Sequence, residues 1–226
     1  MNIIDAAIDA EVQGVVALST DKASSPINLY GATKLASDKL FIAGNSYSGL
    51  KPTKFSVVRY GNVMGSRGSI IPFFNSIKHE GVLPITDPRM TRFMISLEEA
   101  VDVVWHAFDD MVGGEIYVKK IPSMNIVDLS KVIAPEAEHK IVGIRAGEKL
   151  HEQMIGFEDA ISTYSYPGYF KILPTINDWG TDPNRIKDGI QVAEDFIYES
   201  SSNEEWMSTD QLQKWIADNE NKIGKI

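Results

Sequence analysis

Two groups of polar residues near the start of the chain have the types and spacing that proton transfer needs. Tyr30 and Lys34 are four residues apart, so a helix would bring their side chains together on one face. There the ammonium favours the phenolate, which can exchange a proton with a hydroxyl group. Asp21 and Lys22 follow Thr20 directly and supply an acid and a base. A solvated helix pair and an exposed neighbouring ion pair remain the alternatives on spacing alone.

The segments around these residues predict an alternation of helices and strands. We expect helices over about residues 2–10, 29–47 and 70–81, and strands over 15–19 and 54–60. Asn28 is a suitable cap for the second helix, and Gly81 closes the third. This order is typical of an α/β fold with a partial doubly wound (Rossmann-type) parallel sheet.

Ligands of such sheets bind outside the carboxyl ends of the strands, which is where Thr20, Asp21 and Lys22 stand. Successive side chains of a strand point to opposite faces. Asp21 and Lys22 can therefore act together only if the chain leaves β geometry at Thr20.

The second half of the chain is less regular. Capping boxes at Ser96–Glu99 and Ser208–Gln211 predict a helix to about Met111 and a final helix through Leu212, Trp215 and Ile216. Strands are expected over 115–119 and 140–144, and the rest predicts a smaller, loop-rich α+β portion.

Composition excludes several classes of function. The chain has 22 basic and 31 acidic residues and a net charge of -9, so neither nucleic acid nor an anionic membrane is an expected partner. No apolar run is long enough for a membrane span. Cysteine is absent, which fits a cytoplasmic protein, and the four dispersed histidines give no metal site.

Four blocks, in order along the chain, resemble the UDP-N-acetylglucosamine 4,6-dehydratase family, in particular its configuration-inverting members. The blocks are ALSTDKASSPINLYGATKLASDKLF, RYGNVMGSRGSIIPFF, DPRMTRFMISLEEAV and IRAGEKLHEQMI. The usual R-P-G-E-K of this family is Arg145-Ala-Gly-Glu-Lys149 here, which keeps the charged groups. Such a family makes the first intermediate of pseudaminic acid-type sugars in polysaccharide biosynthesis.

The resemblance implies a mechanism within the short-chain dehydrogenase/reductase class. Tyr30, assisted by Lys34, would take the proton from the hydroxyl on sugar carbon 4 while hydride passes to a nicotinamide. A neutral Lys22 would then remove the proton on carbon 5, and a protonated Asp21 would help the carbon 6 hydroxyl to leave as water. Members that retain configuration typically carry Asp-Glu at this pair, whereas Asp21-Lys22 resembles the inverting type.

The resemblance also implies contacts to substrate and cofactor. Residues expected at the UDP-sugar are Thr20, Asn62, Arg145 and Glu148, and those expected at the cofactor, NADP or NAD, are Tyr30, Lys34, Val63, Met64, Gly65, Ser66 and Arg67. Two structural alternatives stay open, because the glycines at 61, 65 and 68 can simply form a turn and Arg145 can pair with Glu148. Arg92 and Phe93 are expected in the core or at an interface.

No glycine fingerprint of the G-x-G-x-x-G type follows a strand in this sequence. The family places this fingerprint upstream of Met1, so we expect an amino-terminal portion to be missing. Residues 1–121 would then be the carboxyl-side part of an NAD(P)-binding domain and 122–226 a smaller, interleaved substrate-binding portion. A full-length protein is expected to be a homo-oligomer. A nucleotide-sugar 4-epimerase, which needs no acid and base for elimination, and an inactive truncated fragment remain the rival functions.

Overall fold

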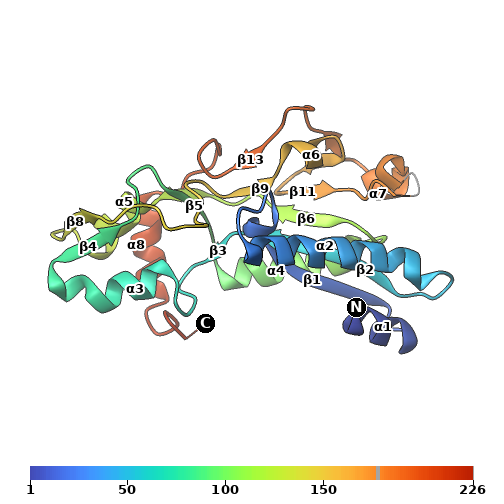
Figure 1. Ribbon diagram of the computed structural model, residues 1–226, viewed down its shortest axis with the longest axis horizontal. Coiled ribbons are helices and arrows are strands. Elements are labelled where there is room, and N and C mark those ends of the chain that lie inside the picture. The colour runs from blue at the N-terminus through green and yellow to red at the C-terminus, as the bar shows by residue number, and fades with distance from the viewer. Residues whose placement is uncertain (177–178, 226) are drawn as a thin grey trace. The chain divides into compact units, whose positions relative to one another are not determined.

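The computed structural model (Figure 1) describes residues 1–176 and 179–225. The contacts within the chain divide it into two compact units. Unit 1 comprises Met1–Tyr60, Val101–Lys120 and Gln153–Tyr198, and unit 2 comprises Gly61–Ala100, Ile121–Glu152 and Glu199–Ile226. Each unit thus takes segments from both halves of the chain. The domain division at residue 121 stays a prediction, and its second range includes residues 177–178 and 226, which lie outside the described residues.

Unit 1 is built on a six-stranded sheet with the order β1-β2-β6-β11-β10-β12. Strand β1(Gly14–Thr20) runs parallel to β2(Lys54–Tyr60) from the pair Gly14–Lys54 to the pair Thr20–Tyr60, and β2 runs parallel to β6(Ile116–Lys119). This parallel part confirms the α/β prediction. The central strand β2 is buried on both faces from Phe55 to Arg59, as is typical of parallel sheets, whereas the edge strand β1 is mostly half-buried and its Leu18 is exposed.

Helices cover both faces of the parallel strands. Phe55 of β2 packs against the first helix α1(Asn2–Asp9) and the long helix α2(Leu29–Ser48), with Ile4 and Phe41 beside it. Val58 of β2 lies on the other face of the sheet and packs against α4(Leu97–Asp110). The first four residues of α4 belong to unit 2. A sheet with helices on both faces is the doubly wound arrangement that the sequence predicts.

A hairpin extends the parallel sheet on its far side. Strands β10(Thr163–Tyr166) and β11(Tyr169–Ile172) are antiparallel, and β11 pairs antiparallel with β6. Pro167 and Gly168 form the turn, where Gly168 has φ of 81° and a side chain would be strained. The sheet is therefore mixed, and this pairing could not be read from the sequence because it joins segments about 50 residues apart.

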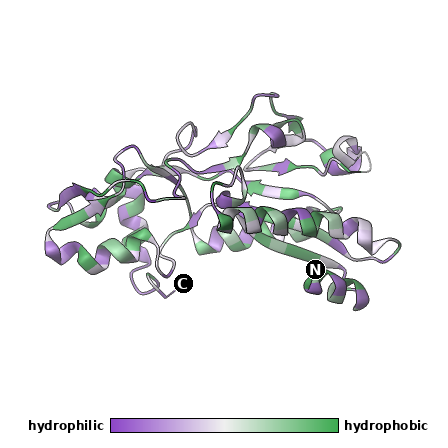
Figure 2. Ribbon diagram, viewed as in Figure 1, coloured by the Kyte–Doolittle hydropathy of each residue, from purple (hydrophilic) through white to green (hydrophobic). Residues whose placement is uncertain are grey.

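Unit 2 packs short elements around one apolar core that includes Leu83, Ile85 and Leu129. A three-stranded sheet has the order β3-β5-β7, and a second sheet pairs β4 with β8 in parallel. Figure 2 shows polar and apolar residues alternating around α3, whose apolar side enters this core. The elements are β3(Asn62–Val63), α3(Ile70–Ile77), β4(Val82–Ile85), β5(Thr91–Ile95), β7(Ser123–Asn125), α5(Ile126–Ile133), β8(Glu138–Ile141) and α8(Thr209–Asp218).

The remaining elements are short. Unit 1 also holds β9(Gln153–Ile155), α6(Phe157–Ala160), α7(Pro183–Ile186) and β12(Ile190–Gln191), while β13(Tyr198–Glu199) lies at the boundary of the units. Three 3₁₀ turns are η1(Asp21–Ala23), η2(Lys78–Glu80) and η3(Trp179–Thr181).

Two details of the sequence prediction are wrong. The strand expected over 140–144 is β8(Glu138–Ile141), which begins and ends earlier because its partner β4 ends at Ile85, opposite Ile141. Thr20 does not leave β geometry, since its φ and ψ are -149° and 157°. The chain turns one residue later, where η1 begins at Asp21.

A buried charge cluster in unit 1 gives a first testable expectation. Burial raises the pKa of Asp110, but hydrogen bonds from Lys171, Lys187 and Tyr117 outweigh this effect and lower the pKa to about 2. The contribution of Asp110 to stability is therefore present above its unfolded value of 3.8 and is lost as the pH falls towards 2. Asp110→Asn should lower the free energy of unfolding at pH 7 by about 1.5–3 kcal/mol.

Urea unfolding at a series of pH values measures this effect. The stability difference between wild type and Asp110→Asn should shrink between about pH 4 and pH 2. Asp109→Asn, at the exposed neighbouring position, is the matched control and should change stability little. A difference that stays constant down to pH 2 would contradict the assignment.

Candidate active site

The turn after β1 holds Asp21 in a strongly polar setting. The Asp21 side chain is fully buried, and its Oδ1 accepts hydrogen bonds from Thr20 Oγ1 at 2.7 Å and from Lys22 Nζ at 3.0 Å. Its Oδ2 has no hydrogen-bond partner among the described residues. One oxygen is thus fixed by two donors, while the other is buried without a hydrogen-bond partner among the described residues. Lys22 stays 37% exposed, so its ammonium is within reach of a ligand.

Helix α2 brings Tyr30 and Lys34 next to this turn. Asn28 caps the helix by accepting a hydrogen bond from Gly31 N at 2.8 Å. Gly31 is needed there, because a Cβ at this position would lie 2.4 Å from the carbonyl oxygen of Lys22. The start of α2 therefore packs directly on η1, and the candidate acid, base and phenol come from two adjoining elements of unit 1. The Tyr30 side chain is 53% exposed.

A buried ion network that the sequence reasoning missed lies further along α2. Arg59 on β2 is 1% exposed and donates to Asp38 Oδ2 at 3.2 Å, to Asp159 Oδ2 at 3.2 Å and to the carbonyl of Met154 at 2.7 Å. Burial raises the pKa of Asp38, and the Arg59 charge opposes that shift. Asp38 is four residues after Lys34, so the network anchors the helix that carries the candidate phenol. An arginine within an apolar strand was the available signal, because buried charges require partners.

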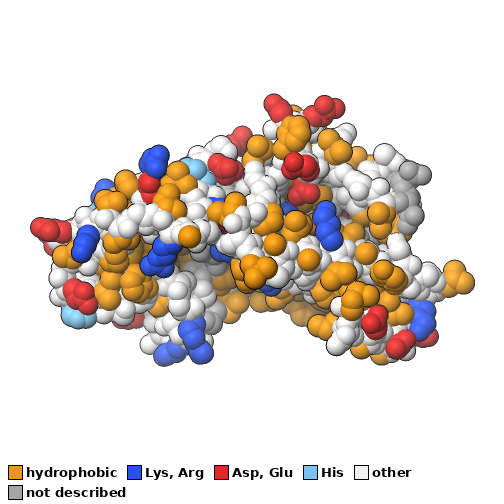
Figure 3. Space-filling model, viewed as in Figure 1, with side chains coloured by type: hydrophobic (Ala, Val, Ile, Leu, Met, Phe, Trp, Pro, Cys, Tyr) orange, Lys and Arg blue, Asp and Glu red, His pale blue; other side chains and the backbone are white. Residues whose placement is uncertain are grey.

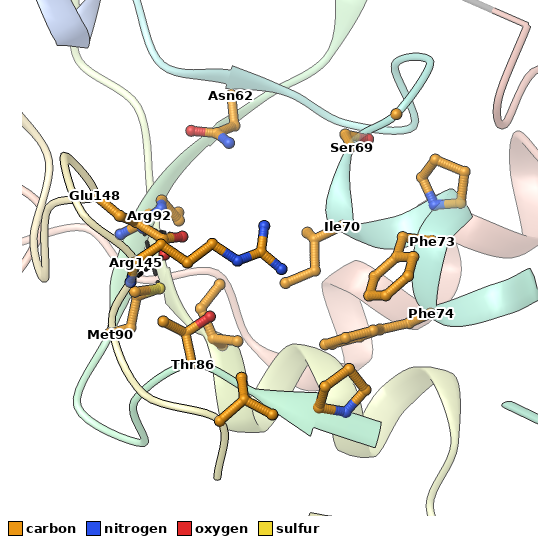
Figure 4. A pocket seen from close by; sticks show the side chains of 15 residues that line it. Asn62, Ser69, Ile70, Phe73, Phe74, Thr86, Met90, Arg92, Arg145 and Glu148 are labelled. Carbon is orange, nitrogen blue, oxygen red and sulfur yellow. Dashed lines mark hydrogen bonds and ion pairs between the residues drawn. The ribbon is translucent and has the colours of Figure 1, made fainter. Parts of the chain in front are cut away.

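Unit 2 contains a cavity of about 610 Å³ that brings together three of the predicted substrate residues (Figure 4). Asn62, Arg145 and Glu148 all line it, and the Arg145 guanidinium extends into its middle. Among the described residues this guanidinium has no ion pair or hydrogen bond, whereas the backbone N of Arg145 donates to Glu148 Oε2 at 3.4 Å. The expected alternative of an Arg145–Glu148 side-chain pair is therefore not what the structure shows. Other lining residues are Ser69, Ile70, Phe73, Phe74, Pro84, Thr86, Ile126 and Val142.

Arg92 belongs to the wall of the same cavity. Its guanidinium lies 3.8 Å from both Glu148 Oε1 and Glu152 Oε1 and donates to the carbonyls of Lys149 and Leu150. Arg92 is 7% exposed and Phe93 is fully buried, so the prediction of core positions is confirmed for both. What the sequence did not indicate is that Arg92 fixes the loop carrying Arg145 and Glu148.

Of the residues predicted for the cofactor, Tyr30 and Lys34 lie on α2, while Val63 ends β3 and residues 64–67 lie between β3 and α3. Gly65 and Gly68 have φ of 72° and 74°, so the expected alternative of a glycine turn holds for these two. Gly61 has no positive φ, and a Cβ there would lie 2.5 Å from Phe93 Cβ. The Met64 side chain is buried in the core of unit 2, and a cofactor contact from Met64 would have to come from its backbone. Ser66 and Arg67 lie on the turn, and Val63 pairs with Ile95 of β5.

The structure thus gathers the predicted residues in two groups. Unit 1 holds Thr20, Asp21, Lys22, Tyr30 and Lys34, and unit 2 holds Asn62, the turn 63–67, Arg145 and Glu148. Every residue of the second group except those of the turn lines the cavity.

The distribution of charged side chains on the surface is consistent with the excess of acidic over basic residues in the sequence. On the face that Figure 3 shows, basic, acidic and apolar side chains are interspersed, and no large basic patch covers the residues drawn there. Across residues 1–176 and 179–225, none of the helices has both the length and the apolar character that crossing a membrane requires.

The family model described as polysaccharide biosynthesis protein matches residues 1–174. A UDP-N-acetylglucosamine 4,6-dehydratase (inverting) from Campylobacter jejuni subsp. jejuni serotype O:2 is 52% identical over 95% of this chain and 66% of its own length. A UDP-glucose 4-epimerase from Rickettsia felis is 41% identical over 76% of this chain and 52% of its own length.

Among solved structures, the X-ray structure of Pen from Bacillus thuringiensis matches with a TM-score of 0.83 and 32% identity, covering 96% of this chain and 65% of that one. The chain therefore spans about two thirds of the length of the dehydratase and the solved structure that it matches. Since the family model covers most of the sequence, the chain belongs to the polysaccharide biosynthesis protein family.

Proposed function

We propose that this chain supplies the catalytic residues and the nucleotide-binding cavity of a nucleotide-sugar 4,6-dehydratase that inverts carbon 5 of UDP-N-acetylglucosamine. The observation that carries this proposal is the buried Asp21 with one free oxygen, hydrogen-bonded to Lys22 and packed against the start of the Tyr30 helix. A dehydratase needs an acid, a base and a tunable phenol. The 52% identity to the inverting dehydratase supports the same assignment.

The side chains of unit 1 can carry each proton of this reaction. Tyr30 Oη, which is one helical turn from Lys34 on α2, accepts the proton of the carbon 4 hydroxyl as that carbon becomes a ketone. The ketone acidifies carbon 5, and neutral Lys22 Nζ removes its proton. Asp21 Oδ2 gives its proton to the carbon 6 hydroxyl, which leaves as water. A proton derived from solvent then adds to carbon 5 on the opposite face, which inverts its configuration.

A nicotinamide cofactor, NAD or NADP, fits the residues present. It supplies the hydride acceptor for carbon 4 and the hydride donor for carbon 6. Tyr30, whose side chain is 53% exposed, and Lys34 would orient it in unit 1. The contacts predicted for residues 63–67 are a separate expectation for unit 2. Neither group of residues selects between NAD and NADP, because that choice depends on a residue beside the adenosine ribose.

The cavity of unit 2 suits a uridine diphosphate. The unpaired Arg145 guanidinium can donate two parallel hydrogen bonds to a pyrophosphate, and Glu148 can accept from ribose hydroxyls. Phe73 is 44% exposed on the cavity wall and offers a flat apolar face for a pyrimidine. Asn62 Oδ1 is buried and has no partner among the described residues, so a ligand donor could satisfy it.

Arg145→Ala should weaken UDP binding without damaging the fold. Loss of a charge-assisted contact to phosphate costs about 1.5–3 kcal/mol, which is roughly a 10-fold to 150-fold rise in Kd. Isothermal titration calorimetry with UDP measures the effect. Arg89→Ala is the matched control, because Arg89 is exposed, belongs to the same unit and lies outside the cavity. Equal losses in the two variants would show that Arg145 does not face the diphosphate.

A nucleotide-sugar 4-epimerase is the second candidate, favoured by the 41% identity to the Rickettsia felis epimerase. Epimerisation needs Tyr30 and Lys34 but neither Asp21 nor Lys22. Mass spectrometry of the product from UDP-N-acetylglucosamine separates the two reactions in the full-length protein. A product lighter by one water is expected, and an isomer of unchanged mass would instead establish the epimerase.

We also propose that the protein acts in the cytoplasm as a homo-oligomer and contributes to a pseudaminic acid-type sugar. The absence of cysteine and the net charge of -9 support a cytoplasmic protein without nucleic-acid or membrane partners. Light scattering on the purified protein measures its oligomeric state.

A further inference from the structure

The turn 63–67 packs on the carboxyl-terminal segment of the chain. Gly224 N donates to the carbonyl of Gly65 at 2.7 Å, and a Cβ at Gly65 would lie 2.9 Å from Trp215 Cη2 and 3.4 Å from Ile223 Cγ1. Met64 enters the same apolar core as Trp215 and Ile223. The turn therefore has a backbone contact and a side-chain contact to the same segment, residues 209–225.

This segment has its own determinants of structure. Ser208 and Gln211 form a complete capping box, so α8 begins at a fixed residue. Leu212 anchors the helix in the core of unit 2. After the helix, Lys222 N donates to the carbonyl of Asn219 at 2.8 Å, which directs the chain back towards Gly65. The segment is thus a folded support for the turn.

The turn connects two parts of the cavity wall. Asn62 immediately precedes it and Gly68 immediately follows it, and both line the cavity that Arg145 enters. Moving the turn would therefore move the wall. The family model ends at residue 174, so the supporting contact comes from a part of the chain beyond the matched residues.

We infer that residues 209–225 are a positioning element of the nucleotide-binding site, in which Trp215, Ile223 and Gly224 hold the turn 63–67 and with it the cavity wall at Asn62 and Gly68. The inference deepens the proposed function, because it rests on that cavity taking a uridine diphosphate. None of the three residues contacts the cavity itself, so they act through the turn.

Gly65→Ala and Gly81→Ala form a matched pair that isolates this contact. The two glycines have the same φ, 72°, so an added Cβ brings similar backbone strain at both. Only at Gly65 does the Cβ meet Trp215, since nothing lies within 4 Å of a Cβ at Gly81, which belongs to the same unit and does not line the cavity. Gly65→Ala should raise the Kd for UDP roughly tenfold, and Gly81→Ala should change it much less.

Trp215→Phe provides the rescue. Phenylalanine lacks the outer indole ring that carries Cη2, so it makes room for the Cβ of Gly65→Ala. The double variant should recover most of the lost UDP affinity, whereas Trp215→Phe should rescue nothing in Gly81→Ala. Non-additivity limited to the first pair shows direct coupling, which a general loss of stability would not produce.

Amide hydrogen exchange of the full-length protein tests the same contact without a ligand. Trp215→Ala should speed exchange in residues 63–69 selectively, while exchange in the strands of unit 1 stays unchanged. Unchanged exchange in 63–69, or faster exchange there with unaltered UDP affinity, would overturn the inference. If the wild-type protein binds UDP but forms no dehydrated sugar, the proposed dehydratase activity is wrong. The UDP affinities and the exchange rates still test the positioning role of residues 209–225.

Discussion

Replacing Tyr30 with phenylalanine in the full-length protein is expected to lower the turnover of UDP-N-acetylglucosamine by about 10²-fold to 10⁴-fold. The substitution removes only the phenolic oxygen, and with it the proposed acceptor for the carbon 4 proton. The side chain is 53% exposed at the start of α2, so the fold should not change. Steady-state kinetics and the thermal unfolding temperature, measured together, separate the two effects.

Tyr47→Phe is the control for this prediction. Tyr47 lies near the end of the same helix and is 66% exposed, so its replacement makes the same chemical change away from Lys34. Turnover should stay close to that of wild type. If Tyr30→Phe also keeps near-normal turnover, the phenol is not the proton acceptor.

Replacing Lys22 with alanine should stop dehydration while the oxidation at carbon 4 remains possible. The variant loses the proposed base for carbon 5 and one of the two donors to Asp21 Oδ1. We expect the rate of dehydrated product to fall by about 10²-fold to 10⁴-fold, with reduced cofactor still formed in a single turnover. Rapid mixing followed at the absorbance of the reduced nicotinamide measures the first step, and mass spectrometry measures the second.

Lys54→Ala is the matched control, because Lys54 is an exposed lysine at the start of β2 in the same unit. It should leave both steps intact. Loss of the oxidation step together with dehydration in Lys22→Ala would mean that Lys22 maintains the structure of the turn and is not the base.

Local rules predicted much of the architecture. The bounds of β2(Lys54–Tyr60), the cap of α2 at Asn28 and the capping box at Ser208 are confirmed, since each depends on residues adjacent in sequence. The parallel pairing of β1 with β2 is also confirmed, because an apolar strand, a helix and a second apolar strand favour that topology.

Long-range partners could not be predicted in this way. The start and end of β8 depend on its pairing with β4, and the hairpin β10–β11 joins the main sheet through β6. Arg92 was expected in the core, which is correct, but its contacts to the loop carrying Glu148 are visible only in the fold. Contacts between distant segments depend on which surfaces come together in the folded chain. A single sequence does not directly specify these contacts.

The candidate site shows the same limit. The sequence indicated that Asp21 and Lys22 needed a departure from β geometry, and the structure supplies it in η1, one residue later than expected. The network of Arg59, Asp38 and Asp159 was missed because Arg59 is 21 residues from Asp38 and 100 residues from Asp159 in the sequence.

The proton at carbon 5 gives the most direct test of the central proposal. The full-length protein would convert UDP-N-acetylglucosamine in deuterated water, and NMR would follow the product as it forms. The account predicts a 4-keto-6-deoxy sugar with deuterium at carbon 5 and inverted configuration there, since the proton that Lys22 removes is exchanged before one returns on the opposite face. A product with retained configuration at carbon 5, or one that keeps its 6-hydroxyl group, would contradict the roles assigned to Asp21 and Lys22.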